Sequence, residues 1–344
     1  MDLWILDEDF TQLGIVDTAT SIIWANRYRQ CGDFEIYVSA SNELLELLQE
    51  DRMVIRQDDD MVGIIEKIHV DTDEENGDYL LVSGRCTRSI LDRRIVWDQT
   101  VINDTVENAM RQLITDAFIA PAMTSRKYTR LALAAAHGYT DTIRVQYTGD
   151  NILEAIEGLC ATKNYGFKVT LQDSMLVVDF YKPANRSASQ SENPHVVFSE
   201  RYDNLTATTY TLDKTGYKTM VLVAGEGEGS ARRRGTFGTF TNGLKRRELF
   251  VDARDISSNE GEITDDEYTQ LLAERAKEAL SEATIVQTME GTIEPLQMYA
   301  YKQDYFLGDI VTVINKYGMQ VDTQVLEVVE VWDENGYTCT PTFG

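Results

Sequence analysis

Cysteines and histidines are scarce in this chain of 344 residues, and each scarcity excludes a class of protein. The four cysteines, Cys31, Cys86, Cys160 and Cys339, lie far apart, and none forms a C-x-x-C pair. This excludes a zinc ribbon and a dithiol redox motif. Scattered single cysteines are typical of buried thiols in a reducing compartment. We therefore expect free thiols in a protein that is made in the cytosol.

Long apolar stretches and positive charge are also lacking. No segment approaches the ~20 apolar residues that a membrane-spanning helix needs, and the start, Met1–Trp4, has no basic or apolar part of a secretion signal. The chain has 32 basic and 57 acidic residues, a net charge of −25. This argues against wrapping DNA or binding an anionic membrane, because both need a basic surface. We expect a soluble protein without stable membrane insertion.

The supply of catalytic and metal-binding residues is poor. None of the three histidines, His69, His137 and His195, lies in an H-E-x-x-H motif. His137-x-x-x-Asp141 matches only half of a zinc endopeptidase pattern, and nothing in the sequence places Cys160 beside His195 as a nucleophile and its base. With 57 acidic residues, spacing alone singles out no carboxylate pair for glycan hydrolysis. We therefore expect no enzyme activity, no catalytic residue, no cofactor and no metal.

Several charged or glycine-rich segments resemble functional motifs without matching them. Gly225–Gly229 is neither G-x-G-x-x-G nor a P-loop, and its glutamates would repel phosphate, so we predict a flexible loop between strands. Asp58–Asp60 and Asp73–Glu75 lack the calcium-loop pattern and are predicted to be solvated turns. The basic groups Arg232–Arg234 and Lys245–Arg247 are either solvated hairpin tips or partners of acidic patches on neighbouring subunits.

Hydrophobic periodicity indicates two strand-rich parts around a mixed region. Asp33–Ser39 alternates as a strand should, Asn76-Gly77 is typical of a hairpin tip, and Pro183–Pro194 has the composition of a linker. Helix starts are predicted at Ser41, at the capping box Asp104-x-x-Glu107 (running through Ile119), at Asp150-Asn151, and at the capping box Thr264-x-x-Glu267. The predicted domains are a first small β-barrel over 1–95, a helical and mixed insertion over 96–148, a small α/β domain over 149–195, and a second β-barrel over 196–344 that contains one helix, 264–282.

Two distant segments repeat the same order of elements. Ile64–Val70 leads through Glu-Asn-Gly to Tyr79, and Val325–Val331 leads through Glu-Asn-Gly to Tyr337. Each follows a short strand and a polar turn. A repeat at this separation suggests two copies of one small barrel. The other interpretation is that any two hairpins look alike, because alternation and Asn-Gly turns are generic.

A series of short motifs, in a fixed order, spans essentially the whole chain. They are Leu3–Asp7, Ala25–Tyr28, Gly32–Ile36, the Gly225–Gly229 loop before Arg232, Tyr305–Val311 and Pro341–Gly344. With these motifs in this order, the chain resembles the siphophage tail-hub family. That family includes the N-terminal region of tail-associated lysins, and it is related to the baseplate hub of contractile phages and to the spike base of type VI secretion.

The resemblance implies a multidomain, β-rich α+β fold with two similar tube-like β-barrels and inserted α/β domains between them. It implies a homotrimer whose six barrels form a pseudo-hexameric ring at the virion tail tip, assembled in the host bacterial cytoplasm. Such a ring closes or extends the tail tube and stacks on a hexamer of the distal tail protein. It receives the C-terminus of the tape-measure protein, docks a spike, fibre or receptor-binding protein, and lets genome DNA pass without specific binding.

Two other functions stay open. Members of the family often carry a lytic or receptor-binding C-terminal extension, and this chain stops at Gly344, directly after the hub region. This stop argues against hydrolase activity and favours docking of a separate spike or fibre. A tail-associated peptidoglycan hydrolase is the first alternative, and it would need a carboxylate pair in a cleft or a metal site. A receptor- or carbohydrate-binding module is the second, and it would need exposed aromatic platforms.

Overall fold

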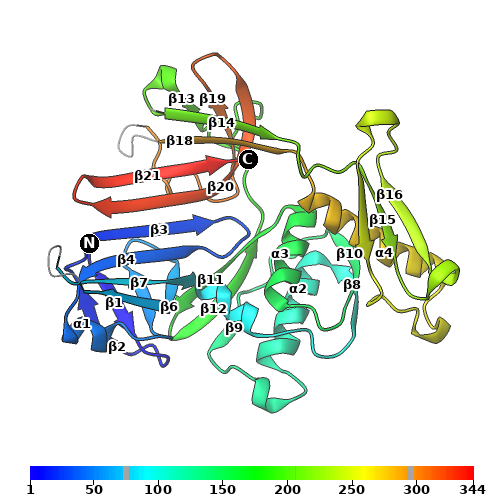
Figure 1. The fold of residues 1–344 in the computed structure, drawn as a ribbon, viewed down its shortest axis with the longest axis horizontal. Helices are drawn as coiled ribbons and strands as arrows, with labels where there is room; N and C mark the ends of the chain where they lie inside the picture. Colours follow the sequence, from blue (N-terminus) through cyan, green and yellow to red (C-terminus); the bar gives the residue numbers. More distant parts are fainter. Residues whose placement is uncertain (73–76, 206, 293–297) are drawn as a thin grey trace.

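The computed structural model describes residues 1–72, 77–205, 207–292 and 298–344. Its main feature is one sheet of thirteen strands that contains both ends of the chain (Figure 1). The first β module comprises β1 (Leu3–Leu6), β2 (Gln12–Val16), β3 (Ser21–Arg27), β4 (Asp33–Ser39), helix α1 (Asn42–Leu47), β5 (Met53–Arg56), β6 (Val62–Asp71) and β7 (Tyr79–Cys86). The second β module comprises β13 (Val197–Ser199), β14 (Ala207–Asp213), β18 (Val286–Thr292), β19 (Ile310–Ile314), β20 (Gln320–Asp333) and β21 (Gly336–Phe343).

The two β modules have the same strand order. The first runs β3-β4-β7-β6-β5-β1, and the second runs β14-β18-β21-β20-β19-β13. In each, the longest strand shifts register against its hairpin partner, after Ile65 in β6 and after Val325 in β20. The predicted repeat is confirmed, but its register is one residue off, because Ile65 rather than Ile64 corresponds to Val325. The modules differ at one end, where β1 is antiparallel to β5 and β13 is parallel to β19.

A mixed region and an outer unit follow the first β module in the chain. The mixed region comprises η1 (Thr87–Arg93), β8 (Thr100–Thr105), α2 (Val106–Ile114), η2 (Thr115–Ile119), η3 (Thr124–Arg126), β9 (Leu131–Leu133), β10 (Thr142–Tyr147), α3 (Ile152–Lys163), β11 (Gly166–Gln172) and β12 (Met175–Tyr181). The outer unit comprises β15 (Met220–Ala224), η5 (Gly229–Ala231), β16 (Arg234–Gly238), η6 (Gly243–Lys245), β17 (Glu248–Asp252), η7 (Asn259–Gly261) and α4 (Asp265–Glu282). The short helix η4 (Glu200–Tyr202) links β13 to β14.

The buried apolar side chains form four clusters. Each β module has its own, with Trp24 and Phe34 in the first and Phe198 and Phe343 in the second. Helices α2 and α3 share a third cluster with β8–β12 and with residues of β1, β5 and β6, such as Ile64. The two predicted insertions, 96–148 and 149–195, therefore bury their apolar side chains together. The boundary drawn between them stays a prediction.

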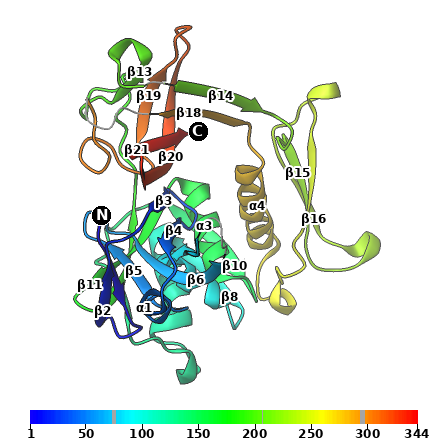
Figure 2. The same ribbon diagram turned by 60° about the vertical axis from the view of Figure 1, so that its left-hand side comes forward.

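The outer unit has the fourth cluster, in which β15 packs against α4 through residues such as Val221 and Leu272. Figure 2 shows the β15–β16 hairpin standing away from the rest, with α4 between it and α3. Strand β15 pairs with β16 and β17 and lies outside the large sheet. The chain segment predicted as one second barrel thus contains two separately packed parts.

Three of the four predicted helix starts are confirmed by their hydrogen bonds. Ser41 caps α1, Asn151 caps α3, and Thr264 and Glu267 form the full capping box of α4. The fourth prediction is wrong, because Thr105 rather than Asp104 caps α2. A side-chain oxygen at the N-cap satisfies amide groups that the helix leaves without a partner, and adjacent Asp and Thr residues can each supply it.

The residue predicted to close that fourth capping box, Glu107, has another role. Its carboxylate is buried and accepts hydrogen bonds from the backbone amides of His137 (2.6 Å), Gly138 (2.9 Å) and Tyr139 (3.1 Å). Burial raises the pKa of Glu107, but these amide hydrogen bonds outweigh it, so the pKa is lowered. The ionised carboxylate therefore fixes the loop that runs from β9 to β10.

We expect Glu107→Gln to destabilise the chain by about 1–3 kcal/mol at pH 7, because a neutral amide replaces a charged acceptor of three hydrogen bonds. A lowered folded-state pKa stabilises the protein above the unfolded pKa of about 4.3 and loses this contribution as the pH falls through the folded value. Denaturant unfolding of both proteins from pH 7 to pH 3 should show the difference shrinking below about pH 4. A constant difference would contradict this role of the charge.

The predicted linker, Pro183–Pro194, is attached to the second β module. The Arg186 guanidinium donates to Asp309 (2.7 Å), and the Ala188 amide donates to the Thr312 hydroxyl (2.8 Å). The segment connects the mixed region to β13 while lying along β19. Of the predicted turn, Asp73–Glu75 and Asn76 lie outside the described residues, and Gly77 has a φ of 81°.

Candidate assembly interface

The two β modules meet where β3 pairs with β20. This antiparallel pairing runs from Ile22 opposite Trp332 to Arg27 opposite Glu327. It joins the modules into one continuous sheet, seen in Figure 1 as the blue strand beside the red ones. We call this pairing the internal junction.

A buried ionic cluster lies on the core side of the internal junction. The Arg56 side chain is 1% exposed and donates from Nη2 to both carboxylate oxygens of Glu330 at 3.1 Å and from Nε to Asp58 at 2.8 Å. The Asp59 carboxylate lies 3.6 Å from Arg56 Nη2 and 2.8 Å from Lys302 Nζ. Arg56 and Asp59 come from the first module, whereas Glu330 and Lys302 come from the segment of the second. The cluster therefore ties the two modules together.

The charges of this cluster are balanced against one another. Burial raises the pKa of Asp59, but the nearby Lys302 and Arg56 outweigh it, so the pKa is lowered and the carboxylate is ionised. Arg56 also stacks on Trp332, with its guanidinium carbon 4.3 Å from the ring centroid. The prediction that Asp58–Asp60 is a solvated turn is confirmed for its outer residues and wrong for Asp59, whose side chain is 0% exposed.

A second set of charges lies on the opposite face of the internal junction. Arg27 Nε donates to Glu327 Oε1 at 2.7 Å across the strand pair, and its Nη1 donates to Asp33 on β4. These side chains are partly exposed, at 28% for Arg27 and 26% for Glu327. Cross-strand pairs of opposite charge help to define the register of a sheet.

Each module has a strand edge that no other described strand covers. Strand β14 is one terminal strand of the sheet and β2 is the other, and among the described residues no strand pairs with the outer edge of β14. On β6, β5 covers only the part up to Ile64, which leaves the Lys67–Asp71 edge open within the same described part. These open edges carry the exposed apolar side chains Val70 (42%), Tyr210 (36%) and Leu212 (49%). Open edges of this kind can pair with another chain.

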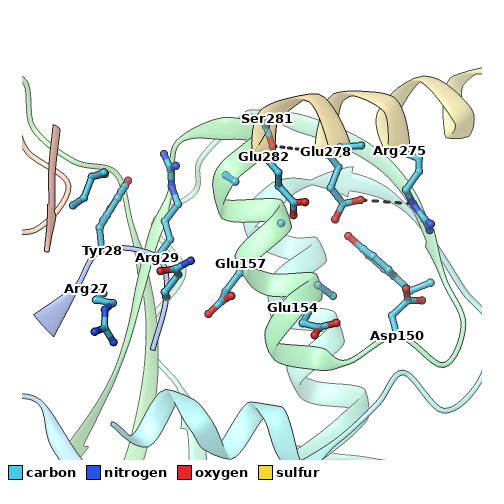
Figure 3. Close-up of a pocket in the computed structure, with 17 residues that line it drawn as sticks. Arg27, Tyr28, Arg29, Asp150, Glu154, Glu157, Arg275, Glu278, Ser281 and Glu282 are labelled. Atoms are coloured by element: carbon cyan, nitrogen blue, oxygen red, sulfur yellow. Dashed lines mark hydrogen bonds and ion pairs between the residues drawn. The ribbon is translucent and has the colours of Figure 1, made fainter. Parts of the chain in front are cut away.

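An acidic cleft of about 750 Å³ lies between β3, α3 and α4. Figure 3 shows Glu154 and Glu157 on α3 facing Glu278 and Glu282 on α4. Burial raises the pKa of Glu157 to about 7 and also raises that of Glu278, which lies 3.7 Å from Arg275. This is the place where the hydrolase alternative would find carboxylates in a cleft.

The structure separates the residues that were considered as catalytic pairs. His137 Nε2 lies 2.9 Å from Asp179, whereas Asp141 bonds to Tyr165 at 2.8 Å and to Lys182. The Cys160 thiol contacts Met110 Sδ at 3.6 Å, and His195 Nε2 bonds to the backbone oxygen of Gln190 at 2.6 Å. Within the described residues, no group of three or more His, Cys, Asp or Glu side chains is arranged to hold a metal ion.

The arginines after the glycine-rich loop are paired within the chain. Arg232 bonds to Asp252, and Arg233 bonds to Asp265 at 2.7 Å and lies 3.3 Å from Glu226. The pairing of these groups with neighbouring subunits stays a prediction, whereas these two side chains have partners within their own chain. The reason is that β17 and the start of α4 bring carboxylates beside the loop, a proximity that the sequence does not reveal.

No described helix is long and apolar enough to span a membrane.

Comparisons with known proteins identify the class. A tail protein from Neisseria meningitidis MC58 aligns with a TM-score of 0.60 at 15% identity, covering 99% of this chain and 95% of that one. The 43 kDa tail protein of prophage MuSo2 from Shewanella oneidensis aligns with a TM-score of 0.61 at 13% identity, covering 100% and 98%. Prophage tail protein gp18 from Listeria monocytogenes EGD-e aligns with a TM-score of 0.55 at 13% identity, covering 99% and 94%. The fold is thus that of bacteriophage tail proteins.

The sequence itself matches the family model described as Siphovirus ReqiPepy6 Gp37-like protein over residues 2–344. No curated protein matches it significantly. The chain belongs to this family of structural phage tail proteins. The resemblance to tail proteins seen in the sequence motifs is confirmed, as is the β-rich α+β fold class.

Proposed function

We propose that the chain is a tail-tip hub protein that forms a homotrimeric, pseudo-hexameric ring. The observation that carries this proposal is the pair of β modules with one strand order, joined into a single sheet in which part of the β6 edge and the outer β14 edge are open among the described residues. A chain that already contains one module-to-module junction can repeat it with the next chain. Three chains then give six modules, and closing the ring covers the open β6 and β14 edges.

The ring position explains the partners that we propose. Sixfold pseudo-symmetry matches a hexamer of the distal tail protein on one side, and threefold symmetry matches a trimeric spike or fibre on the other. The tape-measure C-terminus and the genome would occupy the lumen. The net charge of −25 favours passage of DNA without adsorption, because phosphates are repelled by an acidic surface.

The association state of the purified chain tests the ring. We expect mass measurement in solution, by light scattering or native mass spectrometry, to give three copies of the 39.0 kDa chain at micromolar concentration. The same sample, imaged by electron microscopy, should show an annulus with six lobes around a channel. A stable monomer, even after mixing with the distal tail protein, would overturn the proposal.

The hydrolase alternative has one structural feature in its favour, the acidic cleft between α3 and α4. One of the cleft carboxylates, Glu278, has a partner in the fold, because it lies 3.7 Å from Arg275, which also bonds to Asp255 (2.6 Å). Gly158 on α3 lets Glu278 approach closely, because a Cβ there would lie 2.3 Å from its Oε1. We therefore assign the cleft to the contact between α3 and α4, and degradation of purified peptidoglycan by the chain would contradict this assignment.

A further inference from the structure

The paired strands define which residues of the two β modules correspond. In the first module, partners run across β6, β7, β4 and β3 as Ile65–Gly84–Phe34–Trp24. In the second, partners run across β20, β21, β18 and β14 as Val325–Phe343–Met289–Tyr210. Both paths begin at the residue before the register shift, so Trp24 corresponds to Tyr210. Strand β3 then matches β14 end to end, seven residues each.

This correspondence turns the internal junction into a template for the open edges. At the internal junction, the C-terminal part of β20 pairs with the edge of β3 that faces away from β4. The equivalent surfaces are the C-terminal part of β6 and the edge of β14 that faces away from β18. Both of these edges are open in the single chain, among the residues that the structure describes. They lie in different modules, so the β6 edge of one chain is placed to meet the β14 edge of another.

The template also gives the register. Arg27 pairs with Glu327 at the internal junction, and their equivalents are Asp213 and Lys67. The ion pair is therefore kept with its charges exchanged between the strands. On the core side, the equivalents of Trp24 and Glu330 are Tyr210 and Val70, which are both exposed in the single chain and apolar enough to be buried together.

The exchange of charges discriminates between right and wrong junctions. A β14 edge placed on β20 would set Asp213 against Glu327, and a β3 edge placed on β6 would set Arg27 against Lys67. Like charges directly opposite each other on paired strands are destabilising. The observed pairing of β3 with β20 and the inferred pairing of β14 with β6 both place opposite charges across from each other. Specificity of this kind arises from repulsion in the alternatives as much as from attraction in the intended contact.

We propose that residues Lys67–Asp71 of β6 pair antiparallel with β14 of a second copy of this chain, with Lys67 opposite Asp213 and Val70 opposite Tyr210. This inference rests on the proposed ring, and it adds the contact that closes the ring. Each chain offers both edges, so the contact is head-to-tail and passes from copy to copy until the first and last chains meet.

A zero-length carbodiimide cross-linker tests the register directly, because it joins an amine to a carboxylate only when they are in contact. We expect mixed light and ¹⁵N-labelled chains to give an inter-chain Lys67–Asp213 amide, detected by peptide mass spectrometry. Asp213→Asn should abolish it while leaving other cross-links intact. An inter-chain link from Lys67 to another carboxylate in its place would overturn the register.

Charge exchange tests whether the ion pair contributes to assembly. We expect Lys67→Glu to raise the dissociation constant of the ring about tenfold per junction, since attraction becomes repulsion. Lys67→Glu combined with Asp213→Lys should recover most of the loss. Lys127→Glu, the same charge change at an exposed residue of the mixed region, is the matched control and should have no effect.

The results separate this inference from the ring itself. A wild-type chain that stays monomeric overturns both. A trimer that lacks the Lys67–Asp213 link and tolerates Lys67→Glu leaves the ring standing and overturns the β6–β14 contact. Circular dichroism of each variant shows whether the monomer is folded, so that a loss of assembly is not confused with unfolding.

Discussion

Arg56→Ala is expected to lower the free energy of unfolding by about 3–5 kcal/mol, the cost of leaving buried charge without its partner. The substitution removes the only arginine that contacts both Asp59 and Glu330 in the described ionic cluster. Both carboxylates are almost fully buried, at 0% and 5% exposure of their side chains. Lys302 remains within 2.8 Å of Asp59, but it lies 3.9 Å from Glu330 and replaces Arg56 only in part.

A matched control for Arg56→Ala is Arg93→Ala. Arg93 also pairs with an aspartate, Asp51, at 2.9 Å, but the two side chains are 45% and 72% exposed. Exposed pairs contribute only about 0–1 kcal/mol. Urea unfolding of both variants measures the contrast. Equal losses would mean that water reaches the Arg56 cluster and screens it.

Gly84→Ala is expected to lower the free energy of unfolding by about 3 kcal/mol, at the upper end of the range for overpacking. A Cβ at residue 84 would lie 1.8 Å from the backbone oxygen of Ile64 and 3.0 Å from the backbone nitrogen of Glu66. Both are main-chain atoms at the register shift of β6, so neither can move without disturbing the β6–β7 pairing. The open β6 edge begins just after this point.

Gly216→Ala is the control for Gly84→Ala. A Cβ at residue 216 meets nothing within 4 Å, and this glycine has no positive φ. Its substitution should change the free energy of unfolding by less than about 0.5 kcal/mol. Thermal unfolding followed by circular dichroism distinguishes the two variants. A Gly84→Ala protein as stable as Gly216→Ala would show that the backbone at the register shift of β6 can relax at little cost in free energy.

Local signals in the sequence predicted much of the fold. Ser41, Asn151 and the Thr264 capping box each act on amides within three residues, so the sequence beside them contains the whole interaction. The repeat was visible because hydrophobic alternation and an Asn-Gly turn are also local. Its register was one residue off because the shift after Ile65 depends on the partner strand and leaves no mark on β6 alone.

Interactions between distant residues could not be predicted in the same way. Asp59 was taken for a solvated residue because it lies in an acidic run at a predicted turn, while its partner Lys302 lies far along the chain. Glu107 was assigned to a cap, although its partners follow 30 residues later. A useful signal was available at Arg56, an arginine in an otherwise apolar strand. Such a residue requires a buried counter-charge.

The internal junction and the proposed junction between copies differ in when they form, and their chemistry differs accordingly. The Arg56 cluster forms while a single chain folds. Its charges therefore lose their hydration water during folding and add no desolvation cost to association. In the proposed ring, the β6 and β14 edges stay hydrated until a second copy binds. They carry the exposed charges Lys67 and Asp71 on β6 and Asp213 on β14, together with modest apolar side chains. In the proposed ring, tethering two modules in one polypeptide would reduce an assembly of six bodies to one of three. Every second junction between modules would then form within one chain, at an effective concentration that dilution cannot change.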